Sequence, residues 1–159
     1  MSMLFPTGAK SEWTAQARAI AFGEIETSAS HIPELLEWLR DINWPGAPEI
    51  AGHLCSFGDE LIAPLKIVLR ANDDIWTHWV LASFSDKFGR QFWEPLRDDL
   101  RRVAENEKDD EGANLEALFI LATTKLEGTS WIQEKLGKIK HRNLFDPDDY
   151  EKIEAALGE

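Results

Sequence analysis

The side chains that could bind a metal or act as nucleophiles are few and scattered along the sequence. The four histidines are His31, His53, His78 and His141, and the single cysteine is Cys55. His53 and Cys55 stand two residues apart. That spacing points two side chains in different directions on a helix and makes a poor metal pair. We therefore expect structural or surface roles for the histidines, with no metal site and no cofactor.

Neighbouring carboxylates could bind a cation or carry out acid–base chemistry, and the sequence has four such groups. Two of them stand at expected helix starts, where acids cap the helix and interact with its dipole. A third lies in a polar connector that leads into a helix, and a fourth lies inside a helix on its expected solvent side. We predict structural roles for all four groups, which are Asp73-Asp74, Asp148-Asp149, Asp109-Asp110-Glu111 and Asp98-Asp99.

Known catalytic signatures do not occur in the sequence. There is no Gly-rich phosphate loop, no G-x-S-x-G turn, no H-E-x-x-H helix and no paired C-x-x-C. The sequence therefore predicts no catalytic residues and a protein that is not an enzyme. An enzyme that uses an unrecognised acidic site remains an alternative.

Two tryptophans are candidates for a surface that binds a partner. Trp44 lies beside Asp41, and Trp76 lies beside Asp73 and Asp74, in equivalent places where the second helix of a predicted hairpin begins. An exposed tryptophan at such a turn is a strong interface anchor, whereas a buried one packs as a staple at the helix start. We predict these five residues as the partner-binding edge and leave the exposure of the two indoles open.

The elements that would position these residues are helices arranged in a repeat. Helical periodicity runs through the chain, and no stretch alternates with a period of two. Phe57-Gly58 and Pro64-Leu65 recur 31 residues later as Phe88-Gly89 and Pro95-Leu96, and Pro33 precedes Pro64 by the same interval. This period predicts an all-α, HEAT- or armadillo-like α-solenoid of about three helical hairpins. The alternative is a non-repetitive helical bundle.

The 159 residues are expected to form a single helical-repeat domain, with a repeat core at 11–127 and a two-helix C-terminal cap at 128–159. We expect the first helix at 11–22 with Ser11 as its cap. The third helix should carry Pro45 in its first turn, and one helix should cover 91–106. The cap carries a basic patch of Lys135, Lys138, Lys140 and Arg142, whose role the sequence does not indicate.

The net charge of −12 restricts the possible partners. Binding to nucleic acid depends on Lys and Arg at the phosphates, so this charge argues against DNA or RNA and favours a basic protein. The alternative is that the negative charge serves solubility alone. We expect no membrane association, because no apolar run approaches the length of a membrane span. A single cysteine and the lack of a secretory signal indicate a cytoplasmic protein.

Two long segments resemble a known family. The runs LLEWLRDINWPGAPEI and LIAPLKIVLRANDDIWTHWVLASF are similar to a bacterial domain-of-unknown-function family, number 5071, and the resemblance covers residues 17–126. It implies a HEAT-like helical protein and brings no catalytic residues. Gly46 and Gly52 fall in the expected third helix, where a family sequence often has larger residues.

The sequence predicts a non-enzymatic protein-binding module. More narrowly, we hypothesise an immunity-type protein that neutralises a cytosolic bacterial toxin with a basic surface, because an acidic inhibitor is steered towards such a target. A scaffold or adaptor in a larger assembly is the first alternative. Self-association through exposed tryptophans is another, and the oligomeric state is left open.

Overall fold

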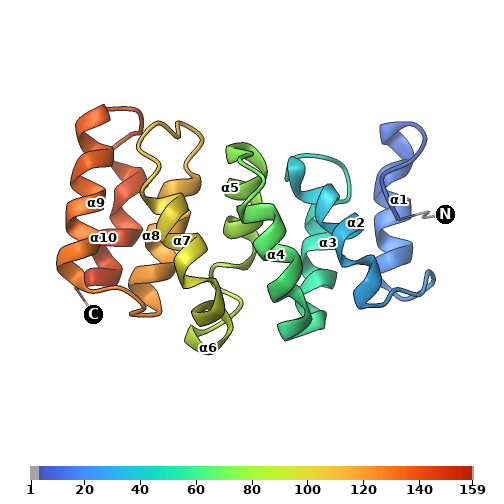
Figure 1. Cartoon of the computed structure of the whole chain (residues 1–159). Coiled ribbons are helices and arrows are strands. Elements are labelled where there is room, and N and C mark those ends of the chain that lie inside the picture. Colours follow the sequence, from blue (N-terminus) through green and yellow to red (C-terminus); the bar gives the residue numbers. More distant parts are fainter. Residues whose placement is uncertain (1–3, 159) are drawn as a thin grey trace. The chain divides into compact units, whose positions relative to one another are not determined.

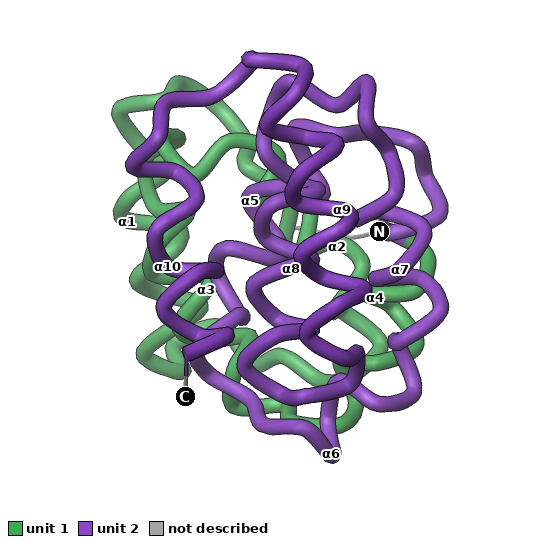
Figure 2. Tube along the Cα trace, turned by 90° about the vertical axis from the view of Figure 1, so that its left-hand side faces the viewer, with its two compact units in different colours: residues 1–67 green, residues 68–159 purple. Residues whose placement is uncertain are grey.

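The computed structural model describes residues 4–158, and every regular element in that range is a helix. Figure 1 shows the helices in chain order, and Figure 2 shows the two compact units into which the chain divides, residues 1–67 and 68–159. The predicted all-α class is confirmed. The solenoid arrangement and the cap at 128–159 stay predictions. No helix of the described part is long and apolar enough to cross a membrane.

Unit 1 is built from short helices whose apolar faces meet around Trp38. The Trp38 side chain is fully buried, and its indole Nε1 donates a hydrogen bond to the Leu4 carbonyl at 2.6 Å. Helices α1 and α3 pack directly against each other. The elements of this unit are α1 (Lys10–Ala21), α2 (Ile32–Leu36) and α3 (Ala47–Leu54), with 3₁₀ turns η1 (Ala29–His31), η2 (Glu37–Arg40) and η3 (Cys55–Leu61).

Unit 2 is organised around α8, which packs against α5, α7, α9 and α10. Helix α8 is buried along most of its length, as expected for a helix that is apolar nearly all round. Helix α4 (Ile62–Leu69) precedes α5. The elements are α5 (Asp74–Phe84), α6 (Arg90–Trp93), η4 (Glu94–Leu96), α7 (Arg97–Ala104), α8 (Ala113–Thr123), α9 (Thr129–Arg142) and α10 (Asp148–Leu157).

Three predicted helix boundaries are wrong. Helix α1 begins one residue before Ser11, so Ser11 lies inside the helix and Ala9 is at the cap position. Pro45 lies outside α3, because the left-handed Gly46 separates them. The predicted helix at 91–106 is interrupted by η4, since Pro95 has no N–H to donate to the preceding turn.

Gly46 permits the close approach of α1 and α3. Its φ is 90°, which favours glycine, and a Cβ at this position would lie 2.5 Å from the Ala17 Cβ. The backbone carbonyl of Trp13 would be 3.0 Å away. A larger side chain would therefore push the two helices apart, which explains why this position holds a glycine.

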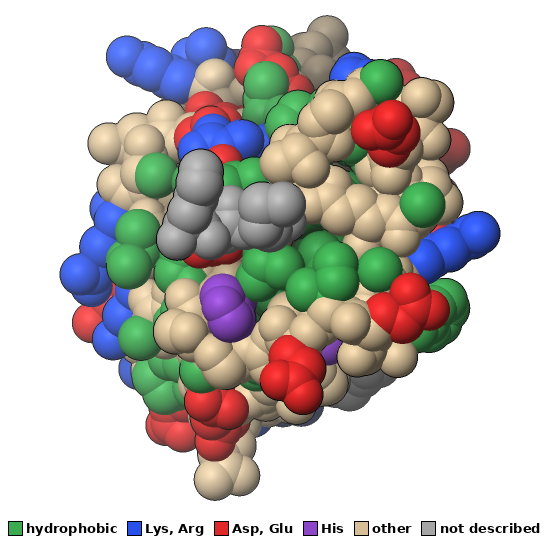
Figure 3. Space-filling model, turned by 90° about the vertical axis from the view of Figure 1, so that its right-hand side faces the viewer, with side chains coloured by type: hydrophobic (Ala, Val, Ile, Leu, Met, Phe, Trp, Pro, Cys, Tyr) green, Lys and Arg blue, Asp and Glu red, His purple; other side chains and the backbone are tan. Residues whose placement is uncertain are grey.

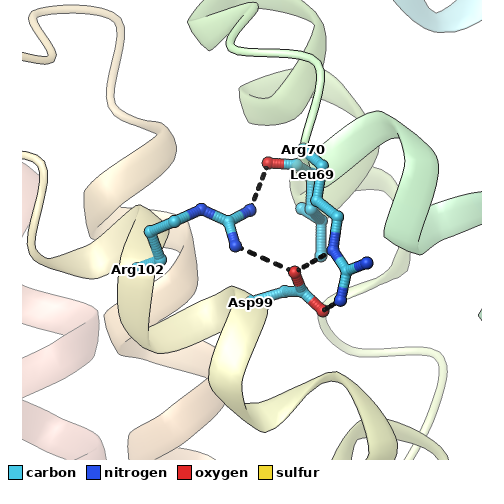
Figure 4. Close-up of polar contacts among 4 residues, drawn as sticks. All are labelled: Leu69, Arg70, Asp99 and Arg102. Carbon is cyan, nitrogen blue, oxygen red and sulfur yellow. Dashed lines mark hydrogen bonds and ion pairs between the residues drawn. The ribbon is translucent and has the colours of Figure 1, made fainter.

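The Asp99 carboxylate is buried, which contradicts its predicted place on the solvent side of a helix. It is 3% exposed, and two arginines bind it (Figure 4). Arg70 Nε and Arg102 Nη1 donate to Asp99 Oδ1 at 2.9 and 3.0 Å, and Arg102 Nη2 donates to the Leu69 carbonyl at 2.8 Å. These contacts join the end of α4 to α7.

A second carboxylate in unit 2 is bound in the same way. The Glu127 side chain is 7% exposed, and its Oε1 lies 3.0 Å from Arg97 Nε and 3.2 Å from Arg101 Nε. Arg70 and Arg101 are 31 residues apart and occupy equivalent positions of the sequence repeat. The repeat therefore includes this arginine position, whereas the two carboxylates lie at different distances along the chain from their arginines.

We expect Gly46→Ala to lower the free energy of unfolding by roughly 1–3 kcal/mol, because the new Cβ overpacks the contact with α1 and strains the backbone. Urea unfolding followed by circular dichroism measures this change. Gly52→Ala is the matched control. No atom lies within 4 Å of a Cβ there, so alanine should stabilise α3 by about 0.5–1 kcal/mol. Equal effects of both substitutions would contradict the proposed close approach.

We expect Asp99→Asn to destabilise unit 2 by about 1–3 kcal/mol at neutral pH, because it removes the charge that two guanidinium groups bind. Asp98→Asn, at the exposed neighbouring position, should change stability by less than about 0.5 kcal/mol. Thermal unfolding of the three proteins measures both effects.

The difference in stability between the native sequence and Asp99→Asn should depend on pH. Burial alone would raise the pKa of Asp99, but the hydrogen bonds and charges of Arg70 and Arg102 hold it below its usual value. The stabilisation is therefore complete above about pH 4 and is lost as pH falls through the lower pKa of the folded chain. A difference that stays constant down to pH 2 would contradict this assignment.

Candidate functional site

The start of α5 presents two carboxylates. Asp73 is the cap of this helix, and its Oδ1 accepts a hydrogen bond from the Trp76 backbone N–H at 3.0 Å, as its position in the sequence predicts. Asp74 follows in the first turn. The side-chain amide of Asn106 donates to Asp74 Oδ1 at 3.4 Å. Asn106 thereby brings the connector between α7 and α8 next to α5.

The connector between α7 and α8 is held by one buried carboxylate. Asp109 is 1% exposed and accepts hydrogen bonds from the backbone N–H groups of Glu111 and Asn114, at 2.7 and 2.8 Å. Asn114 Nδ2 in turn donates to the Asn106 carbonyl at 3.0 Å. These bonds fix the loop, while the side chains of Asp110 and Glu111 remain exposed.

The carboxylates of the connector and of α5 lie close enough to affect one another. Partial burial raises the pKa of Asp74, and the negative charges of Asp109, Asp73, Asp110 and Glu111 raise it further. All of these effects act in the same direction, so the local potential at Asp74 is negative. Such a surface attracts a cationic group.

The start of α10 carries further acids and lies beside the same connector. The start of α10 and the connector are at one end of unit 2 (Figure 1). Between them is a pocket of about 360 Å³. Its lining residues are His78, Glu111, Gly112, Leu115, Glu116, Phe145, Asp148, Asp149, Glu151 and Lys152. We define the acidic edge as Asp73, Asp74, Asp109, Asp110, Glu111, Asp148, Asp149 and Glu151. Within residues 4–158, no group of three His, Cys, Asp or Glu side chains is arranged to hold a metal ion.

The inner wall of the pocket contains polar atoms without partners. Glu116 is 7% exposed, and Lys152 Nζ donates to its Oε1 at 2.7 Å. Among residues 4–158, neither its other oxygen, Oε2, nor His78 Nδ1 has a hydrogen-bond partner, and both atoms are buried. Gly112 leaves space beside that imidazole, since a Cβ there would lie 3.3 Å from His78 Nδ1. Two residues that line the pocket therefore each carry a covered polar atom that has no partner among the described residues.

The five predicted partner-binding residues are divided between the two units. In unit 2, Asp73 and Asp74 belong to the acidic edge, whereas Trp76 is 8% exposed and offers a partner little of its indole. In unit 1, Asp41 Oδ1 accepts from the Asn43 N–H at 2.8 Å in a turn. Trp44 is half-buried, and its ring makes an edge contact with Trp13 at 5.6 Å between centroids.

Unit 1 also has an apolar surface on the side where α1 lies. Figure 3 shows hydrophobic side chains gathered there between scattered acidic groups. Among the exposed apolar side chains of this unit, Phe22 is 75% exposed and Phe5 is 42% exposed. Exposed apolar side chains alone do not define a site, since they are common on protein surfaces.

Sequence reasoning missed His78 and Glu116. His78 is 38 residues away from Glu116 along the chain, and only the packing of α5 on α8 brings both to one pocket. Glu116 did carry a signal, because it is a charged residue within the apolar run of α8. A carboxylate in such a run is buried and requires a partner.

The basic patch of α9 is largely neutralised by neighbouring acids. Lys135 Nζ lies 3.7 Å from Glu105, and Lys138 Nζ lies 3.6 Å from Glu134. Lys140 Nζ donates to Glu154 Oε1 at 2.6 Å. These lysines therefore do not form a free cationic surface that would attract an anion.

A larger hollow, of about 500 Å³, lies beside Phe88 and Phe119. Its arginine is already engaged, since Arg90 Nη1 donates to the carbonyls of Lys125 and Thr124 at 3.0 and 3.4 Å. The smaller pocket at the acidic edge is the better candidate, because two polar atoms of its lining residues, Glu116 Oε2 and His78 Nδ1, have no partner in the described part of the chain.

Comparison with known proteins identifies the family. The family described as a domain of unknown function, DUF5071, matches residues 10–123. The chain therefore belongs to this family, as the resemblance of its tryptophan-rich segments implies. No curated protein and no solved structure matches the chain.

We expect the stability of Asp74→Asn relative to the native sequence to increase as pH rises from 4 to 7. The raised pKa of Asp74 means that its ionisation opposes folding above that pKa, and the penalty is relieved as pH falls through it. Asparagine removes the penalty, so the free energy of unfolding of Asp74→Asn should exceed that of the native sequence by a fraction of a kcal/mol at neutral pH. Chemical unfolding at several pH values measures this, with the exposed Asp59→Asn as a control. A pH-independent difference would count against the mutual repulsion of these acids.

Proposed function

We propose that this member of the DUF5071 family is a protein-binding module without catalytic activity. The observation that carries the proposal is the convergence of carboxylates from α5, the connector and α10 on one edge of unit 2. A fixed, strongly negative surface is suited to a basic protein, since it steers the partner and selects against acidic ones.

More narrowly, the chain is an immunity-type protein that neutralises a basic toxin in the bacterial cytosol. A toxin that cuts nucleic acid carries basic residues at its substrate site, because these residues neutralise phosphates. The acidic edge takes the place of the phosphates and blocks that site. The net charge of −12 agrees with this role, because it adds long-range attraction to the local contact.

The wider architecture in this proposal is a HEAT-like stack of helical hairpins. The 31-residue recurrence of Phe-Gly, Pro-Leu and arginine positions supports it. Each hairpin alone is too small to bury its apolar face, so a stack places helix starts and connectors in series along one edge. That arrangement provides a series of loops for a protein partner.

Co-purification from the native host, followed by a growth assay, tests the function. The proposal predicts a basic partner encoded next to this chain, and growth rescue when both are expressed together. Recovery of the chain with no partner, together with no protection from the neighbouring gene product, would contradict it. A stable and non-toxic partner would indicate a scaffold or adaptor instead.

With a purified basic partner, we expect Asp110→Asn with Glu111→Gln to slow association by about tenfold at low salt, because exposed charges act on the association rate. The effect should shrink as ionic strength rises. Surface plasmon resonance at two salt concentrations measures it. Asp59→Asn with Glu60→Gln, two exposed acids outside the acidic edge, is the matched control. Equal slowing by both pairs would attribute binding to net charge alone.

A further inference from the structure

We propose that the pocket of the acidic edge receives the side chain of one arginine from the protein partner. This inference rests on the proposed function, because it specifies how the acidic edge recognises a basic protein. It assigns the pocket-lining residues His78 and Glu116 as the groups that bind the guanidinium.

The buried carboxylate of Glu116 is incompletely paired. Glu116 is 7% exposed and has only Lys152 as a partner, on Oε1, whereas its Oε2 is buried without a hydrogen bond. A buried acceptor that stays unpaired destabilises the folded chain. At Asp99, by contrast, two guanidinium groups donate the hydrogen bonds that a buried carboxylate needs. Because Oε2 is covered in this conformation, an incoming guanidinium would supply the missing donor when the Glu116 side chain turns towards the pocket.

The remaining wall of the pocket combines an imidazole with apolar side chains. His78 Nδ1 is buried without a partner, and in the neutral tautomer that is protonated on Nε2 it is a hydrogen-bond acceptor. The side chains of Leu115 and Phe145 also line the pocket. An arginine has several N–H donors in one plane and a weakly hydrated face that stacks on an aromatic ring. Its side chain therefore matches both the acceptors and the apolar lining.

The charge around the pocket is predominantly negative. Glu111, Asp148, Asp149 and Glu151 line it in addition to Glu116, and Lys152 is the one lysine or arginine among its lining residues. This excess of carboxylates favours a cation over an anion or a neutral group. A volume of about 360 Å³ lies at the small end of ligand pockets, which fits one side chain better than a folded segment.

An NMR titration of the whole chain with N-acetyl-arginine-methylamide tests the inference. We expect saturable shifts of the His78 imidazole and Gly112 amide signals, with a dissociation constant on the order of 1 mM, as befits a single side chain. The citrulline analogue has the same shape without the charge and should bind at least about tenfold more weakly. No saturable shift at the pocket, or an equal response to citrulline, would overturn the inference.

Two variants of the pocket should change binding in opposite directions. Glu116→Gln should weaken binding of the arginine probe at least about tenfold, because it removes the central negative charge. Lys152→Met should tighten it, because it frees Glu116 Oε1 and removes the ammonium group that competes with the guanidinium, while methionine keeps an apolar side chain of similar length. Glu134→Gln, on α9 and outside the pocket, should bind as the native chain does.

These outcomes separate this inference from the proposed function. If the chain neutralises a basic partner but the arginine probe leaves the pocket signals unchanged, the pocket assignment fails alone. If the probe binds and depends on Glu116, while no basic partner is found, the proposed function fails alone. If Glu116→Gln does not fold, the Lys152→Met result decides, since unchanged or weaker binding there contradicts the proposal.

Discussion

The burial of carboxylates between helices is the constraint on which unit 2 depends. A carboxylate removed from water destabilises the folded state unless donors replace the lost hydration. Asp99 receives its donors from two arginines, one of which also binds the Leu69 carbonyl at the end of α4. The same side chains therefore satisfy a buried charge and set the position of α7 against the preceding segment. Helix α8 then packs on α7 and carries the wall of the pocket.

The buried carboxylates of this unit are satisfied in different ways, and the difference indicates function. Asp109 is bound by backbone N–H groups, which leaves it fixed and without a free oxygen, so its role is to hold the connector. Glu127 resembles Asp99, because two arginines contact it. Glu116 has one lysine and one oxygen without a partner. Structural demands alone would favour a completed pair at this position, so an open acceptor beside a pocket points to an external donor.

The sequence predicts the helices better than the contacts between them. Asp73 caps α5 as predicted, because the preference for an aspartate at a helix start depends only on neighbouring residues of the chain. The burial of Asp99 was missed, since its partner Arg70 is 29 residues away and helical periodicity does not reveal which polar residue faces a neighbouring helix. The sequence does not reveal the proximity of His78 and Glu116 for the same reason, since the packing of α5 on α8 brings them to one pocket. Gly46 was misplaced within a helix, because its close contact with Ala17 is also a tertiary effect.

The 31-residue period links these observations. Arg70 and Arg101 are equivalent in the repeat, and each binds a shielded carboxylate that lies further along the chain and that a second arginine also contacts. The recurring part is the arginine, since the two carboxylates differ both in type and in their distance along the chain from it. Glu116 and His78 differ from these completed pairs, because each carries a polar atom without a partner among the described residues, and both line the pocket where the acids of the edge converge.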